Sequence, residues 1–328
     1  MHFHLTEEQK AIQEAVRRTL ADSWPIERIH AFADGDADFD RASWDALMAL
    51  GLGGILLPDS GMGLLDAALA CEVAGEAAAA GPLIGQLLAV AAAAASGKAN
   101  PDALASGEAV ATLVHGGSAF VPCARAADIF LVVDRAAGVR LVPAGDGVTI
   151  EAVRASDRTR PVSKVAFAEG AGEMLFAAAD PVTARLADAA LVLLAADALG
   201  GAQKVTDMSV AYAKEREQFG QPVGRFQALK HQLAHMALDV EPARALVWYA
   251  AYAWDAELPD APRAAAMAKA HLCDVYVRAT RAAVAAHGGI GYTWEYGLNY
   301  WFRRALFDRA WLGSPSEHRA RAADLASW

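Results

Sequence analysis

The sequence predicts a mainly helical protein with a small β domain between an N-terminal helical domain and a C-terminal four-helix bundle. The composition is rich in alanine, with 55% hydrophobic and 21% charged residues, which is typical of a packed helical protein. Strand-like patterning is confined to about residues 108–179, and long helical patterns follow it. Because 328 residues exceed one ordinary hydrophobic core, we expect domains at 1–105, 106–181 and 182–328.

The first helix has a clear start signal. Thr6 and Gln9 have the spacing of a capping box, and Leu5 precedes them as a hydrophobic staple. The apolar residues that follow at helical spacing are Ile12, Val16 and Leu20.

Further helices are expected over 42–50 and between 64 and 97. Gly51 follows the first of these as a natural C-cap. The segment 51–54, Gly-Leu-Gly-Gly, resembles a fragment of a dinucleotide-binding fingerprint, but it follows a helix and lacks the βαβ context. We therefore interpret it as a helix-ending loop.

Short β-rich segments make up the middle of the chain. They are separated by Gly, Asp and Pro turn signals and lie at 109–114, 128–133, 138–143, 147–153 and 161–168. After Asp180-Pro181 the helical period returns over 184–214, 227–255, 261–287 and 296–326. Four long helices joined by short loops predict an antiparallel bundle.

Charge and cysteine usage exclude several classes of protein. The net charge is -10 and no basic run is present, which argues against nucleic-acid binding. The three cysteines are far apart, without CxxC spacing, so we expect neither a disulfide framework nor a zinc site. His231 and His235 are four residues apart, but the glutamate of an HExxH motif is missing between them. We expect no metal.

No targeting or spanning segment is predicted. The first residues lack a basic region followed by an apolar stretch, so we expect a cytoplasmic protein. The apolar run 77–96 is long enough to suggest a membrane span, but it contains Gly81, Pro82, Gly85 and Gln86. A pair of buried helices is expected there.

Two segments of the last third differ from ordinary helix sequence. The first, residues 216–227, reads REQFGQPVGRFQ and joins two predicted helices. The second, residues 287–296, reads HGGIGYTWEY and is a glycine-rich turn edged by aromatic residues. Taken on their own, Arg216 could be a surface arginine beside Glu215 or Glu217, and the glycines could serve a tight turn between helices.

Together, these segments resemble the R-x-x-F-G and G-G-x-G-[YF] signatures of the acyl-CoA dehydrogenase family, which approach FAD across a subunit boundary. The family's fold has an N-terminal helical domain, a middle β-barrel-like domain and a C-terminal four-helix bundle, in agreement with the pattern above. The resemblance implies α,β-dehydrogenation of an acyl-CoA thioester with FAD as cofactor and an electron-transfer flavoprotein as electron acceptor.

The resemblance also assigns cofactor contacts. It puts Arg216 and Phe219 against the flavin nucleotide, Gln227 near its ribose-phosphate, and Gly288 and Gly289 beside the adenine. Ser314 is a further expected contact. A guanidinium forks onto pyrophosphate oxygens, and glycines let backbone N–H groups approach closely.

The sequence departs from the family where a catalytic glutamate is needed. The common base position corresponds to Leu312, ahead of Gly313-Ser314, and the alternative position on an earlier helix corresponds to Ala190. Neither side chain can accept the α-proton. The middle domain also lacks the T-E-P-x-A-G-S-D and W-I-[TS] stretches that hold the flavin ring, and Ala285 replaces a glutamine usual before the glycine-rich turn.

The retained and missing parts predict a half-site subunit. The chain would contribute FAD contacts to a site shared with a glutamate-bearing partner, and the resemblance implies a heterotetramer like those acting on steroid side-chain CoA thioesters. One alternative is a self-sufficient homo-oligomer with a relocated base, and another is a redox-silent acyl-CoA-binding scaffold. The acids considered as a relocated base are Glu72, Glu76, Glu295 and Glu317.

Overall fold

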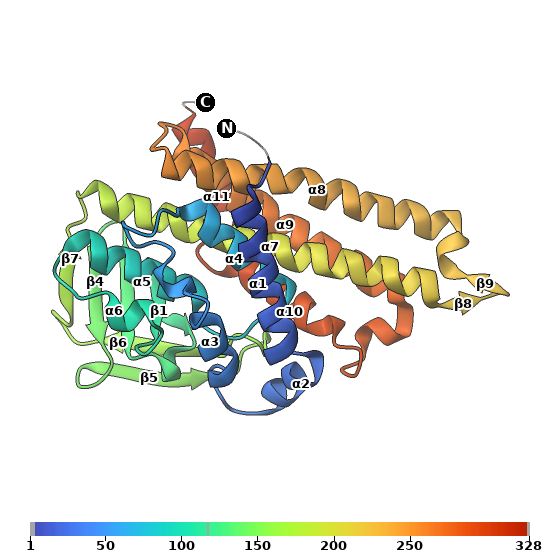
Figure 1. Cartoon of the computed structure of the whole chain (residues 1–328), viewed down its shortest axis with the longest axis horizontal. Helices are drawn as coiled ribbons and strands as arrows, with labels where there is room; N and C mark the ends of the chain where they lie inside the picture. The colour runs from blue at the N-terminus through green and yellow to red at the C-terminus, as the bar shows by residue number, and fades with distance from the viewer. Residues whose placement is uncertain (1–3, 117, 327–328) are drawn as a thin grey trace.

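The computed structural model describes residues 4–116 and 118–326 and confirms the predicted order of a helical, a β and a second helical region (Figure 1). The first region contains α1 (Glu7–Ser23), α2 (Ile26–Asp34), α3 (Arg41–Met48), α4 (Leu64–Glu76), α5 (Leu83–Ser96) and α6 (Asp102–Ala105). The exact domain boundaries stay predictions.

The predicted capping box at the start of α1 is present. The Gln9 backbone N–H donates to Thr6 Oγ1 at 3.1 Å, and the Thr6 N–H donates to Gln9 Oε1 at 3.1 Å. Gly51 follows α3 in the left-handed region with φ 79°, as expected of a helix-ending glycine, but residues 52–54 form a short 3-10 helix, η1 (Leu52–Gly54), where a loop was expected. The sequence did not indicate α2, a nine-residue helix that begins after Pro25.

Two sheets form the β region. One contains β1 (Ala111–His115), β3 (Ile129–Asp134), β4 (Gly138–Pro143) and β7 (Glu173–Phe176) in this order, and the other contains β2 (Phe120–Pro122), β6 (Val162–Phe167) and β5 (Val148–Val153). A small apolar core includes Val121, Phe130 and Val165. β1 and β3 are parallel, so their carboxyl ends meet at one edge and bring His115 beside Val133.

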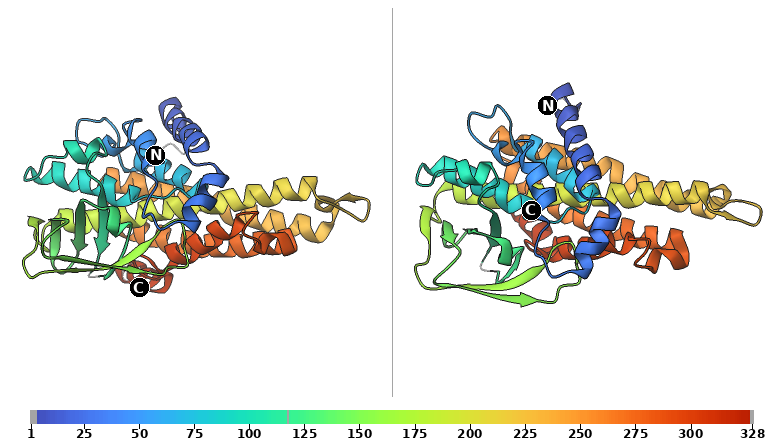
Figure 2. Two further views of the ribbon diagram at one scale, coloured as in Figure 1. Left: turned by 90° about the horizontal axis from the view of Figure 1, so that it is seen from below. Right: turned by 60° about the horizontal axis from the view of Figure 1, so that its bottom comes forward.

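The C-terminal region is built on three long helices. They are α7 (Pro181–Glu215), α8 (Gln227–Asp255) and α9 (Ala261–His287), and the minimal hairpin of β8 (Glu217–Gln218) and β9 (Gln221–Pro222) joins the first two. Figure 2 shows this hairpin projecting beyond the rest of the chain at the end opposite the β region.

The expectation of one terminal helix over 296–326 was wrong. The chain forms η4 (Gly288–Tyr292), then α10 (Leu298–Ala310) and α11 (Pro315–Leu325). Leu312 and Gly313 have φ of 60° and 96°, which a helix cannot contain, and Pro315 starts α11 in its first turn. Leu312, the position that the resemblance assigns to the catalytic base, therefore lies in a turn between two helices. Within the described ranges, no helix is both long and apolar enough to cross a bilayer.

Candidate functional site

The first motif occupies the projecting tip of the α7–α8 hairpin. Arg216 is the C-cap residue of α7, and Gln227 begins α8. Phe219 and Gly220 form the hairpin turn with φ of 54° and 76°. This turn leaves the Phe219 ring 92% exposed, with Phe226 packed edge-on at 6.0 Å between ring centroids. Arg216 and Gln227 are exposed as well.

The glycine-rich motif forms η4 at the end of α9. Gly288 has φ 65°, a conformation that favours glycine. A Cβ atom added at Gly288 or Gly289 would meet nothing within 4 Å, so the backbone of this turn faces open space. A flat ligand can therefore approach these two peptide groups without displacing any side chain.

Aromatic packing joins the two motifs at one end of the molecule. Tyr212, one turn before Arg216, stacks on His287 at a centroid distance of 4.5 Å. The His287 Nδ1–H donates to the Ala283 carbonyl at 2.7 Å, so Nε2 accepts from the Tyr296 hydroxyl at 2.9 Å. Burial lowers the pKa of His287, in keeping with this neutral form. The tip of α7 and the turn after α9 are thus held side by side.

This end of the molecule is an exposed surface with one cationic and several apolar side chains. Among the described residues, Arg216 forms no ion pair and its guanidinium is available to a pyrophosphate. Three further large apolar residues on η4 and the loop after it are exposed, namely Ile290, Tyr292 and Trp294. These side chains form an open surface rather than an enclosed pocket.

A separate cavity of about 700 Å³ lies between the β region and the helices α10 and α11. Its walls include Phe120, Val153, Val162, Phe307, Trp311, Leu312, His115, His318 and Arg321. Leu312, which the resemblance assigns to the base position, is on this wall and is 4% exposed. His318 Nε2 donates to the Leu312 carbonyl at 2.7 Å and fixes the turn.

Ser314, an expected cofactor contact, caps α11. Its Oγ accepts from the Glu317 N–H at 3.3 Å, and its own N–H donates to Glu317 Oε2 at 2.6 Å. These hydrogen bonds lower the pKa of Glu317, which makes it a weaker base. Glu317 lines the cavity, but its carboxylate is already used in the cap.

The other acids considered as a base lie elsewhere. Glu72 pairs with Arg244 and Glu76 with Arg17, both on the helical side of the molecule. Glu295 is exposed beside the glycine-rich turn. None of these three acids is among the residues that line the cavity.

The alternative base position is buried in the protein core. Ala190 is 0% exposed, in the N-terminal third of α7. Thus neither family position presents a carboxylate.

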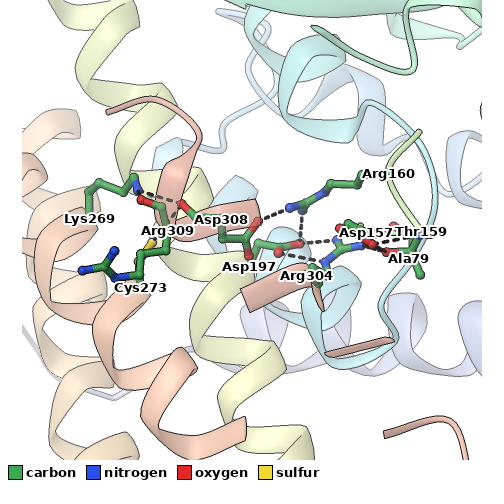
Figure 3. A network of polar contacts seen from close by, with 10 residues as sticks. All are labelled: Ala79, Asp157, Thr159, Arg160, Asp197, Lys269, Cys273, Arg304, Asp308 and Arg309. Atoms are coloured by element: carbon green, nitrogen blue, oxygen red, sulfur yellow. Dashed lines mark hydrogen bonds and ion pairs between the residues drawn. The ribbon is translucent and has the colours of Figure 1, made fainter. Parts of the chain in front are cut away.

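The sequence did not indicate a buried ion network behind the cavity (Figure 3). Arg304 of α10 donates to Asp197 of α7 at 2.6 and 3.1 Å, and Arg160 pairs with Asp197 at 2.8 Å and also with Asp308. Burial alone would raise the pKa of Asp197, but the two guanidiniums outweigh it and hold that pKa well below its usual range. At Asp308 burial dominates and raises the pKa.

Lys269 anchors the end of α10. It is fully buried, and its Nζ donates to the Asp308 and Arg309 carbonyls at 2.7 and 3.3 Å. These carbonyls belong to the last turn of the helix, where a cation is favourable. The position of the Leu312 turn is therefore set by α9, by α11 and by the ion network together.

The described residues contain no group of three His, Cys, Asp or Glu side chains placed to hold a metal ion. His231 and His235 are exposed on α8. The three cysteines are buried free thiols.

Sequence comparison matches two family models. The N-terminal domain of acyl-CoA dehydrogenase matches residues 6–99, and its C-terminal domain matches residues 183–324. Acyl-CoA dehydrogenase IpdE2 of Mycolicibacterium smegmatis is 31% identical over 322 residues, which are 97% of this chain and 98% of that protein.

Solved structures show the same fold. The Tcur3481-Tcur3483 steroid ACAD, as a variant, is 26% identical with a TM-score of 0.88, covering 98% of each chain. The ChsE4-ChsE5 complex of Mycobacterium tuberculosis is 22% identical with a TM-score of 0.87, covering 100% of this chain and 99% of that one.

Proposed function

This chain belongs to the acyl-CoA dehydrogenase family, and from this premise we propose that it is a subunit that contributes FAD contacts to an active site completed by a glutamate-bearing partner. The family comprises FAD-dependent oxidoreductases that act on a CH–CH bond. The substrate of the complex is an acyl-CoA, and the likeness to a steroid ACAD supports a steroid-derived acyl group.

One observation carries the proposal. The chain keeps the motif residues that reach outward, Arg216 and Phe219, on an exposed tip, while Leu312 stands at the base position on the wall of its own cavity. A leucine cannot take a proton, so in this proposal the carboxylate comes from another chain. The names of the ChsE4-ChsE5 complex and of the Tcur3481-Tcur3483 enzyme support an assembly of unlike subunits.

Each part of the tip has a role in this assembly. The Arg216 guanidinium would donate two parallel hydrogen bonds to the pyrophosphate. Phe219 would cover an apolar face of the nucleotide, and Gln227 would hydrogen-bond its ribose-phosphate. Gly288 and Gly289 present peptide N–H groups where a side chain would block the adenine. When bound, FAD supplies the hydride acceptor, and this chain holds and shields it. The electron acceptor of the complex would be an electron-transfer flavoprotein.

The test is a flavin titration of the assembled complex. The chain is co-expressed with a glutamate-bearing relative, and FAD is quantified by its visible absorption. We expect R216Q to weaken FAD binding by about 10- to 100-fold, since a hydrogen bond to a charged group contributes about 1.5–3 kcal/mol. R18Q removes another exposed arginine, on α1, and we expect it to leave FAD binding unchanged.

Two results of the flavin titration would contradict the proposal. If the purified chain alone holds one FAD and oxidises an acyl-CoA, the self-sufficient homo-oligomer is correct. In that case E317Q should abolish turnover, because Glu317 is the acid on the cavity wall. If neither preparation binds FAD, the redox-silent scaffold is correct.

A further inference from the structure

We infer that a pocket between the first two helices and α7 is a ligand site of its own, for an apolar α-amino acid. The walls of this pocket come from α1, α2, α4, α7 and α10. It shares no lining residue with the cavity beside Leu312, and Arg216 does not line it. The inference therefore goes beyond the proposed function and depends neither on FAD nor on a partner subunit.

The pocket has the size of a small-molecule site and a largely apolar wall. Its volume of about 620 Å³ is within the range of such sites. The apolar residues that α1, α2 and the proline between them contribute are Leu20, Ala21, Trp24, Pro25, Ile26 and Ile29. Ala21 and Pro25 are exposed, so a ligand can reach this wall from solvent. An apolar side chain of the ligand would cover it.

The wall formed by α7 carries a positive charge. Lys204 lines the pocket and is half-buried. Its Nζ lies 6.0 Å from the centroid of the Trp301 ring, which is part of the same lining. An ammonium group in this position is a suitable partner for a ligand carboxylate.

About one turn further along α7, Asp207 supplies a negative charge. Its exposed carboxylate accepts a hydrogen bond from Gln203 Nε2 at 2.9 Å. Neither Lys204 nor Asp207 belongs to an ion pair in the part of the chain that the structure describes. Residues three apart are neighbours on a helix surface, so both charges are presented on the same wall.

The other two charged residues of the lining neutralise each other. Arg17 donates to both carboxylate oxygens of Glu76, at 3.0 and 3.2 Å. The lining therefore has no net charge, but it offers one unpaired cation and one unpaired anion, Lys204 and Asp207. An α-amino acid carries an ammonium and a carboxylate on one carbon and would match both. A fatty acid or a simple amine would match only one of them.

Titration calorimetry with phenylalanine tests the inference on the full chain without FAD. We expect one phenylalanine per chain, and binding at least about fivefold weaker for phenethylamine and for 3-phenylpropionate, each of which lacks one of the two charges. K204Q should remove the preference for phenylalanine over phenethylamine, and D207N the preference over 3-phenylpropionate. The matched controls are K214Q, exposed on α7, and D22N, exposed on α1, which lie outside the lining and should keep both preferences.

Blocking the pocket gives a second test that leaves both charges in place. A21W fills the pocket from an exposed position on α1 and should abolish binding, whereas A11W, exposed on the same helix and outside the lining, should not. Three results would overturn the inference. They are no saturable binding of phenylalanine by the wild-type chain, equal affinity for phenylalanine and both singly charged probes, or equal effects of A21W and A11W.

Discussion

At the scale of single residues, His115 shows how burial determines protonation. It ends β1 at the wall of the cavity, where burial, and then the positive charge of Arg135, lower its pKa from 6.5 to about 4. The folded chain therefore holds this imidazole neutral at pH values where the unfolded chain protonates it. Its contribution to stability is present above pH 6.5 and is lost as the pH falls from about 6.5 towards 4.

We predict that H115N flattens the pH dependence of unfolding. When the pH is lowered from 7.5 to 5.0, the wild-type protein should lose about 2 kcal/mol more free energy of unfolding than H115N does, since one pKa unit corresponds to about 1.4 kcal/mol. Urea titrations at the two pH values measure this difference. H231N, at an exposed site on α8, should follow the wild-type pH dependence. Parallel curves for H115N and wild type would contradict the assignment.

Single residues also show where prediction from sequence ends. The sequence shows that position 312 carries no carboxylate, but it does not show the turn in which Leu312 lies. A leucine with φ 60° is uncommon and is stabilised here by the His318 hydrogen bond and by the buried Lys269 at the end of α10. These partners come from α11 and α9, so local propensity does not reveal them.

At the scale of elements, the crossing of α4 and α7 depends on glycine. A Cβ atom at Gly200 would lie 1.7 Å from the Glu72 carbonyl oxygen, and one at Gly75 would lie 2.0 Å from the Asp197 carbonyl oxygen. The two backbones are therefore in direct contact, and any side chain at either position must push the helices apart. Asp197, which anchors the ion network, lies on this stretch of α7.

We predict that G200A destabilises the fold by at least about 2 kcal/mol. Alanine favours a helix by about 1 kcal/mol, but the backbone shift that relieves the clash costs more. Chemical denaturation measures the change. G289A, where an added Cβ would meet nothing within 4 Å, should stay within about 0.5 kcal/mol of wild type. Equal stability of G200A and wild type would show that the crossing can relax.

Among the elements, the long helices could be predicted from the sequence because their apolar period extends over many turns. The predicted segments 227–255 and 261–287 match α8 and α9. The short elements could not be predicted in this way. β2 has three residues and β7 has four. Each is held by pairing with a strand far along the chain: Phe120 of β2 lies opposite Lys164 of β6, and Phe176 of β7 lies opposite Val139 of β4. Their positions depend on tertiary pairing.

At the scale of the whole molecule, the fold brings distant motifs together. Arg216 and Gly288 are separated by two helices in sequence, yet the packing of α7 against α9 places both at one end of the bundle. The bundle predicted from the sequence was sufficient to expect this. The ion network was not predictable, because Arg160 and Asp308 are 148 residues apart and meet only where the β region contacts α10.

The exposed end of the bundle leads to a prediction about assembly. Phe219 is 92% exposed, and Ile290, Tyr292 and Trp294 are exposed at the same end, a grouping typical of a protein interface. We predict that F219S weakens association with the partner subunit at least about tenfold, as removal of a buried aromatic anchor does. Its free energy of unfolding should not change, because the side chain has little contact within its own chain. Sedimentation velocity over a concentration series, with urea unfolding of the chain alone, measures both quantities.

L238S removes a side chain that is 68% exposed on α8, away from the tip, and should leave association intact. If F219S and L238S assembled equally well, this end of the bundle would not be the interface, and the FAD site would have to be sought within the chain.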